Sequence, residues 1–135
     1  MSSPDAPGPA GFGELSWVEV CDSTNTLVRP LIAELPPQTA PRAVAVADAQ
    51  SAGRGRLDRR WEAAAGSALM LSIAHEAPSD PEVLGALPLA MGLAAVEAVA
   101  ATVGTVPGLK WPNDLLVEVG GPDGWKKVGG ILGES

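Results

Sequence analysis

The chain has 135 residues, 9 basic and 16 acidic side chains, a formal net charge of −7 and 46% hydrophobic residues. This length favours one domain, and the apolar content supports a packed core and disfavours wholesale disorder. The acidic balance argues against non-specific nucleic-acid binding, because phosphate neutralisation needs clustered Lys and Arg. A single cysteine, Cys21, excludes an intramolecular disulfide, and a single histidine, His75, leaves no Cys/His zinc site. With no secretory signal in residues 1–13, we expect a soluble, cytoplasmic, metal-poor domain.

The first part of the chain predicts a strand, a helix and a second strand. In chain order we expect a disordered tail at 1–13, a strand at 15–21, a helix at 24–35, a proline-rich loop containing Pro36, Pro37 and Pro41, and a buried strand at 43–49. Asp22 and Ser23 are suited to cap the helix, and Pro30 would kink or divide it.

The second part predicts a loop followed by a strand, a helix and further strands. Residues 51–60 read SAGRGRLDRR and indicate a mobile loop. After it we expect a strand at 69–74, a helix from Pro81 to Val103 that Pro88 restarts, an extended segment at 109–111, and a hairpin of strands at 115–119 and 127–132. Pro88 and Glu97 favour a buried helix over a membrane span. This order predicts an α+β (α/β layered) fold with a mixed sheet flanked by helices.

The segment Gly53-Arg54-Gly55-Arg56 has the composition of an anion-binding loop. Glycines allow close backbone approach to a ligand, and arginines supply permanently charged, planar donors for carboxylate or phosphate. On its own, the segment is equally consistent with a solvated surface loop or an RNA-binding arginine–glycine patch.

Three further segments have ordinary explanations when each is taken alone. Lys110-Trp111-Pro112-Asn113-Asp114 would be a strand-exit turn with a buried Trp. Ser23-Thr24-Asn25 would be a helix N-cap, and Lys127-Val128-Gly129-Gly130-Ile131-Leu132 a glycine-containing strand.

The order and spacing of these four segments resemble the biotin–protein ligases from about Trp17 to the last residue. That family carries Ser-Thr-Asn, a Gln-x-Ala-Gly-Arg-Gly-Arg loop followed by Trp, Lys-Trp-Pro-Asn-Asp, and Lys-x-Ala-Gly-Ile-Leu-x-Glu. The matching segments here are Ser23 to Asn25, Gln50 to Arg56 with Trp61, Lys110 to Asp114, and Lys127 to Leu132 with Glu134. Seven of the nine cations fall in or beside these segments: Arg54, Arg56, Arg59, Arg60, Lys110, Lys126 and Lys127.

The resemblance implies a catalytic domain of the biotin/lipoate ligase type, which resembles class II aminoacyl-tRNA synthetases. Residues 14–135 would be its N-terminal part, truncated before further strands and a small β-barrel domain. The lack of a winged-helix domain before Trp17 implies the monofunctional class. Two departures are local: Leu57-Asp58 stand where Gly or His is common, with Asp58 expected to pair with a neighbouring arginine, and Gly129 stands where Ala is usual.

The resemblance also implies a two-step acyl transfer. Biotin and MgATP would give biotinyl-5′-AMP, and a lysine of a biotin carboxyl carrier protein of the acetyl-CoA carboxylase type would then attack it. The substrates are biotin, ATP and Mg²⁺, with no tightly bound metal, no nucleic acid, no membrane, and a homodimer left open. Implied biotin-binding residues are Ser23, Thr24, Asn25, Gln50, Gly53, Arg54, Gly55, Arg56, Trp61 and Lys110. Implied nucleotide-binding residues are Arg54, Arg56, Trp61, Asn113 and Lys127, and implied catalytic residues are Arg56, Lys110, Asp114 and Lys127. Asn113 and Asp114 would orient the adenylate, the magnesium ion or the incoming lysine.

Three alternatives compete with an active biotin ligase. In the first, the chain is too short to work and is an inactive or binding-only fragment of such a ligase. In the second, it is an RNA-binding module. In the third, it is a lipoate ligase, which shares the fold. The Lys110 to Asp114 and Gly53 to Arg56 segments favour biotin over lipoate.

Overall fold

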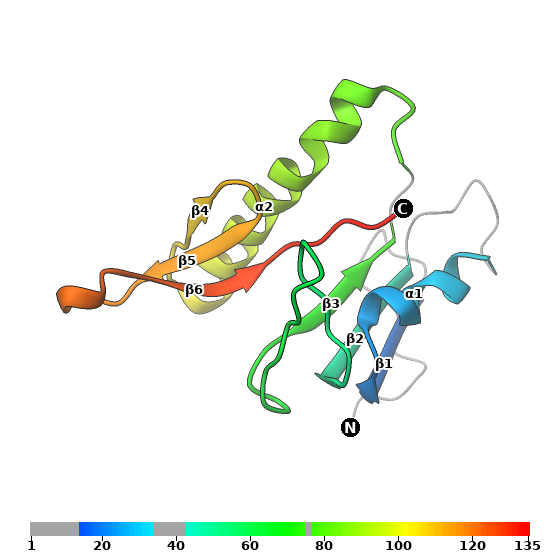
Figure 1. Ribbon diagram of the computed structural model, residues 1–135, viewed down its shortest axis with the longest axis horizontal. Coiled ribbons are helices and arrows are strands. Elements are labelled where there is room, and N and C mark those ends of the chain that lie inside the picture. Colours follow the sequence, from blue (N-terminus) through cyan, green and yellow to red (C-terminus); the bar gives the residue numbers. More distant parts are fainter. Residues whose placement is uncertain (1–13, 34–42, 75–76) are drawn as a thin grey trace. The chain divides into compact units, whose positions relative to one another are not determined.

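The computed structural model describes residues 14–33, 43–74 and 77–135 (Figure 1). These residues divide into two compact units, one up to Glu76 and one from Ala77 onward. The expected tail at 1–13, the proline-rich loop and His75 lie outside the described residues.

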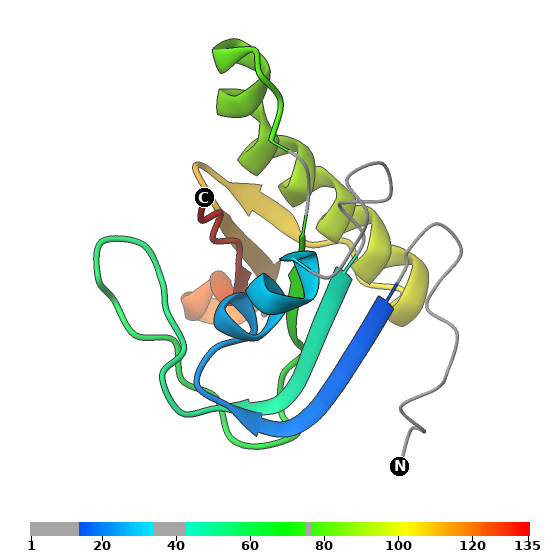
Figure 2. The same cartoon turned by 90° about the vertical axis from the view of Figure 1, so that its right-hand side faces the viewer.

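The first unit is a mixed three-stranded sheet with a helix on it. Its elements are β1 (Glu14–Cys21), α1 (Thr24–Ala33), β2 (Ala43–Gln50) and β3 (Met70–Ile73). β2 lies at the centre, parallel to β1 and antiparallel to β3. Figure 2 shows β1 and β2 side by side with α1 beside them. The expected mixed sheet is therefore confirmed in this unit.

The core of the first unit forms where α1 covers β2. Val28 of α1 packs with Ala43 and Ala45 of β2 and with Ala74, and Leu27 and Leu31 lie against this cluster. The run from Ala43 to Ala47 is buried throughout, as the short apolar run between breakers predicted. Burying one valine contributes about 1.5–3 kcal/mol. Pro30 does not divide the helix, which continues to Ala33.

The second unit contains a long helix and an antiparallel sheet. Its elements are α2 (Pro81–Val103), β4 (Gly108–Lys110), β5 (Asp114–Glu118), the short 3₁₀ turn η1 (Gly121–Asp123) and β6 (Trp125–Gly130). β5 is central and antiparallel to both neighbours, which confirms the predicted hairpin. β6 begins and ends two residues earlier than predicted, and the described strands form two sheets rather than one.

The long helix α2 differs from its prediction in two ways. It is continuous through Pro88, between an Asp80 cap that accepts the Glu82 N–H (2.9 Å) and Gly104 in the left-handed conformation (φ 71°). It is also mostly exposed, since within its unit its main contacts among the described elements are with β4 and β5. Only Gly92 of the helix is buried, at a contact with Leu109 where a Cβ would lie 2.8 Å from Cδ1. By length and composition alone this helix could cross a membrane, a test that core helices also pass.

Candidate functional site

In the first unit, the side chain of Gln50 caps the start of α1. The Thr24 N–H donates to Gln50 Oε1 at 2.8 Å, and the Thr24 hydroxyl lies 3.1 Å from the same oxygen. The Asp22 carboxylate instead accepts the N–H of Ser23, and Ser23 O accepts the Leu27 N–H. The helix start is therefore held by the end of β2, a contact that the predicted Asp22 and Ser23 cap did not include.

Ser72 of β3 completes this polar cluster from the third strand. Its Oγ lies 2.7 Å from Thr24 Oγ1 and also donates to Asn25 Oδ1. Ser72 and Thr24 are both buried, and Gln50 Nε2 donates to Met70 Sδ at 3.7 Å. Sequence reasoning missed Ser72, although it is the one hydroxyl in the apolar run LMLSIA.

The arginine loop is a small hairpin rather than an irregular loop. Arg54 and Arg60 form an antiparallel bridge, and the Gly55 N–H donates to Arg59 O at 2.7 Å. Leu57 and Asp58 at the tip both have φ of 57°. Two consecutive left-handed residues closed by an Arg59 N–H to Arg56 O bond of 3.3 Å have the form of a type I′ turn. Figure 2 shows the segment after β2 as a green loop.

Backbone contacts fasten the base of this hairpin beside the polar cluster. The Ser51 and Ala52 N–H groups donate to Cys21 O and Asp22 O at 2.9 and 2.8 Å. A Cβ at Gly53 would lie 2.4 Å from Trp61 O and 2.8 Å from Gln50 Nε2, so only glycine fits there. The structure thus brings together the base of the arginine hairpin and the cluster around Gln50.

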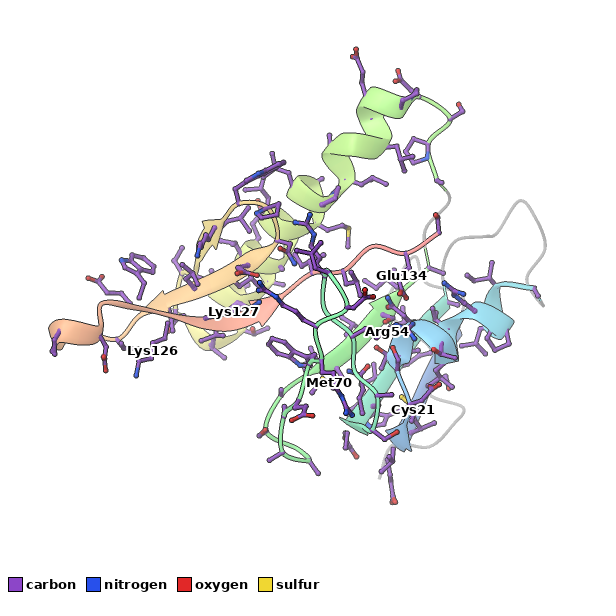
Figure 3. All side chains as sticks on the ribbon, viewed as in Figure 1. Cys21, Arg54, Met70, Lys126, Lys127 and Glu134 are labelled. Carbon is purple, nitrogen blue, oxygen red and sulfur yellow. The ribbon has the colours of Figure 1, made fainter. Side chains whose placement is uncertain are left out.

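The arginines of the hairpin are exposed, and one of them reaches α1. Arg54 Nη1 donates to Thr26 Oγ1 at 3.4 Å, in the first turn of the helix (Figure 3). Arg60 Nε of this loop pairs with Glu62 Oε1 at 3.7 Å, so this arginine has a partner other than Asp58, and the expected pairing of Asp58 with an arginine stays a prediction. Guanidinium groups beside a helix N-terminus make a region favourable to anions.

Cys21 ends β1 close to this region. Burial, and then the negative charge of Asp22, raise the pKa of its thiol. A thiol that stays protonated at neutral pH is a poor nucleophile. Cys21 therefore lacks the character of a nucleophilic cysteine.

In the second unit, Lys110 to Asp114 form the connection between β4 and β5. Lys110 and Asp114 are register partners across the two strands, and the Trp111–Pro112 peptide is cis. Trp111 is 73% exposed, so the ordinary strand-exit turn with a buried tryptophan is not what forms.

Lys127 of β6 reaches back along the sheet to Asp114. Its Nζ lies 2.8 Å from Asp114 Oδ1, and its chain passes Gly130, where a Cβ would lie 3.5 Å from Cε and Nζ. Lys126 pairs instead with Asp123 at 3.1 Å. Neighbouring strand residues point to opposite faces, so Lys126 and Lys127 lie on different faces of the sheet (Figure 3).

Asn113 holds the β4–β5 connection against the end of β6. Its Nδ2 donates to Ile131 O at 3.0 Å, and its own carbonyl accepts the Ile131 N–H at 2.9 Å. Asn113 and Asp114 are therefore placed differently: the amide of Asn113 is bonded to backbone, and the carboxylate of Asp114 is bonded to Lys127.

The described residues also bear on metal binding and on the departure from the family pattern at Gly129. Over residues 14–33, 43–74 and 77–135, His, Cys, Asp and Glu do not gather in any group of three suited to hold a metal ion. At Gly129, the alanine usual in the resembled family would place its Cβ 3.2 Å from Leu115 Cδ1, a tight contact that Leu115 must relax.

Comparison with known proteins identifies the family. A family model described as "Biotin/lipoate A/B protein ligase family" matches residues 17–135. The chain belongs to this family. That membership confirms the resemblance read from the four segments.

Two relatives within the ligase family have been named for their activity. The "Biotin--[acetyl-CoA-carboxylase] ligase" of Mycobacterium tuberculosis is 41% identical over 95 residues, which cover 67% of this chain and 34% of that protein. The "Bifunctional ligase/repressor BirA" of Bacillus spizizenii is 34% identical over 121 residues, covering 89% of this chain and 34% of that protein.

A solved structure from the ligase family confirms the fold. The biotin protein ligase of Aquifex aeolicus, solved in complex with biotin and ATP, superposes with a TM-score of 0.70 at 35% identity. The match covers 92% of this chain and 47% of that one. The chain thus spans about a third of the length of these curated relatives and about half of this solved ligase.

Proposed function

We propose that the chain carries the substrate-handling residues of an ATP-dependent biotin–protein ligase. In this reaction the biotin carboxylate attacks the α-phosphorus of MgATP, giving biotinyl-5′-AMP and releasing pyrophosphate. The ε-amino group of a lysine on a biotin carboxyl carrier protein then attacks the acyl carbon, forming an amide and releasing AMP. The observation that carries the proposal is the Gln50-capped cluster fastened to the arginine hairpin. We propose a cytoplasmic location, where ATP and the carrier are available.

The polar cluster is suited to the uncharged head of biotin. Hydroxyl and amide groups lie around the start of α1 and come from Thr24, Asn25 and Gln50. The Trp61 N–H donates to Gly53 O at 2.9 Å, which holds Trp61 beside this loop. A site lined with paired donors and acceptors rejects ligands that leave them unsatisfied. Ser23, which is buried at the same helix start, supports this cluster.

The cations are suited to the two anions that must meet. Arg54 and Arg56 on the hairpin, with Gly53 and Gly55 allowing close backbone approach, would hold the biotin carboxylate and the adenylate phosphate. Lys110 and Lys127 would bind the carboxylate or the phosphate, Asp114 would orient Lys127 or the incoming lysine, and Asn113 would position this turn. In this proposal the residues catalyse adenylation by holding the two reactants together and by stabilising the charge that develops on the α-phosphate.

Biotin-dependent pyrophosphate release by the 135-residue chain tests this proposal. Arg56→Ala should weaken biotin or adenylate retention, and Lys110→Ala should remove most adenylation without unfolding the chain. Arg29→Ala is the matched control, since Arg29 is also exposed but lies on α1 outside the four segments. Unchanged pyrophosphate release in Lys110→Ala, or equal losses in Arg29→Ala, would contradict the assigned roles. Lipoate should compete poorly with biotin in the same assay.

The second candidate is a binding-only fragment of such a ligase. The observation that favours it is the coverage of about half of the solved ligase. Saturable biotin binding with no pyrophosphate release would support it, and turnover would exclude it.

A further inference from the structure

Ser72 contacts two residues of the candidate site, Thr24 and Asn25, that lie far from it in the sequence. It lies on β3, 48 residues from Thr24 and 47 from Asn25 in sequence. Its Oγ contacts Thr24 Oγ1 at 2.7 Å and Asn25 Oδ1, and Thr24 in turn contacts Gln50 Oε1. Ser72 is therefore the central link of a chain of polar side chains.

The number of hydroxyl protons limits how the hydrogen bonds around Ser72 can be directed. Thr24 and Ser72 each carry one hydroxyl proton, whereas Gln50 Oε1 and Asn25 Oδ1 only accept. Two protons must therefore serve three close oxygen pairs. Both contacts of Ser72 are satisfied when the Thr24 hydroxyl donates to Ser72 and the Ser72 hydroxyl donates to Asn25, while Gln50 Oε1 accepts the Thr24 N–H at 2.8 Å.

We propose that Ser72 is a positioning residue of the biotin-binding site, holding Thr24 and Asn25 in the orientation that a ligand meets. The ligand named here rests on the proposed function, whereas the positioning does not. Ser72 is 7% exposed and Thr24 is 4% exposed, so water cannot readily replace this hydroxyl. With Gln50 Oε1 accepting from Thr24, its Nε2 offers donors, next to the weak Met70 sulfur acceptor at 3.7 Å.

Removing the hydroxyl should loosen the helix start without disturbing the rest of the sheet. In Ser72→Ala we expect Thr24 amide exchange to speed up about fivefold, the equivalent of one hydrogen bond. The side-chain amide signals of Asn25 and Gln50 should shift in nitrogen–proton NMR spectra. The amide of Val46 on β2 should keep its protection within about twofold, since its strand bonds are untouched.

The ligand-binding arm compares biotin with ATP in the same variants. Biotin affinity should fall about fivefold in Ser72→Ala while ATP affinity stays within about twofold. Ser72→Thr retains the hydroxyl and should restore both the NMR signals and biotin affinity. Ser67→Ala is the control, because Ser67 is exposed and bonds locally to Ala64 O at 2.7 Å.

The outcomes separate the positioning role from the proposed function. Unchanged Thr24 exchange and unchanged Asn25 and Gln50 signals in folded Ser72→Ala would overturn the positioning role, as would the same changes in Ser67→Ala. If Ser72→Ala fails to fold, Ser72→Cys, of similar size but weak hydrogen bonding, decides by the same signals. A wild-type chain that binds no biotin contradicts the proposed function, and the exchange data still decide the role of Ser72.

Discussion

Lys127 Nζ and Asp114 Oδ1 lie 2.8 Å apart, joining β6 to β5. Their side chains are 44% and 25% exposed, so the pair is partly screened and contributes at most about 1 kcal/mol to stability. The geometry keeps a lysine charge at a defined place beside the Lys110 to Asp114 segment. The pair is therefore better explained by orientation than by stability.

Replacing Lys127 should separate activity from stability. Lys127→Ala should lower biotin-dependent pyrophosphate release about 100-fold, the usual effect of losing one charge-stabilising donor. Its urea midpoint should change little. Lys126→Ala, which breaks the pair with Asp123, is the control and should release pyrophosphate within about twofold of wild type. Equal activity losses in the two variants would refute a specific role for Lys127.

Removing the amide of Asn113 should loosen the connection between β4 and β5. Asn113→Ala loses the bond from Nδ2 to Ile131 O and should cost about 1 kcal/mol in the free energy of unfolding, measured in urea. Asn113→Asp should cost more, because it places a carboxylate oxygen against the Ile131 carbonyl. Thr105→Ala, at an exposed position of the same unit, should have little effect. A stability of Asn113→Ala equal to wild type would show that this bond is dispensable.

A side chain at Gly53 should push the arginine hairpin away from Gln50. The new methyl of Gly53→Ala would lie 2.4 Å from Trp61 O, so the backbone must move, at a cost of about 1–3 kcal/mol. We expect lower thermal stability and lost biotin binding. Gly55→Ala tests the same substitution two residues away, where the nearest atom is 3.5 Å distant, and its melting temperature should stay close to that of wild type. A normal melting temperature for Gly53→Ala would be inconsistent with the observed packing.

The tip of the hairpin is strained and should be easy to stabilise. Leu57 and Asp58 both have φ of 57°, a region that costs a leucine about 1–2 kcal/mol. Leu57→Asn combined with Asp58→Gly gives the residues that type I′ turns prefer and should slow Gly55 amide exchange about fivefold or more. Leu69→Asn, at another exposed leucine, is the control. Faster exchange in the double variant would rule out this turn.

The local elements and the four motifs were predictable because their signals are short-range. The run from Ala43 to Ala47 indicated a buried strand, and the Gly-Pro-Asp-Gly turn indicated the β5–β6 hairpin. Proline was harder to interpret. Pro30 and Pro88 were expected to kink, divide or restart helices, yet α1 and α2 continue through them. The exposure of α2 was also missed, because the sequence of a helix does not show which other element packs against it.

The sequence by itself determined the family, the order of elements and the identity of the polar and cationic side chains. Tertiary structure decided which of them meet. The Gln50 cap on Thr24 spans 26 residues, the Ser72 link to Thr24 spans 48, and Lys127 meets Asp114 only through the pairing of β5 and β6. Local propensity carries no information about such distant partners. They are chosen by sheet register and by the need of buried polar groups for a hydrogen-bond partner.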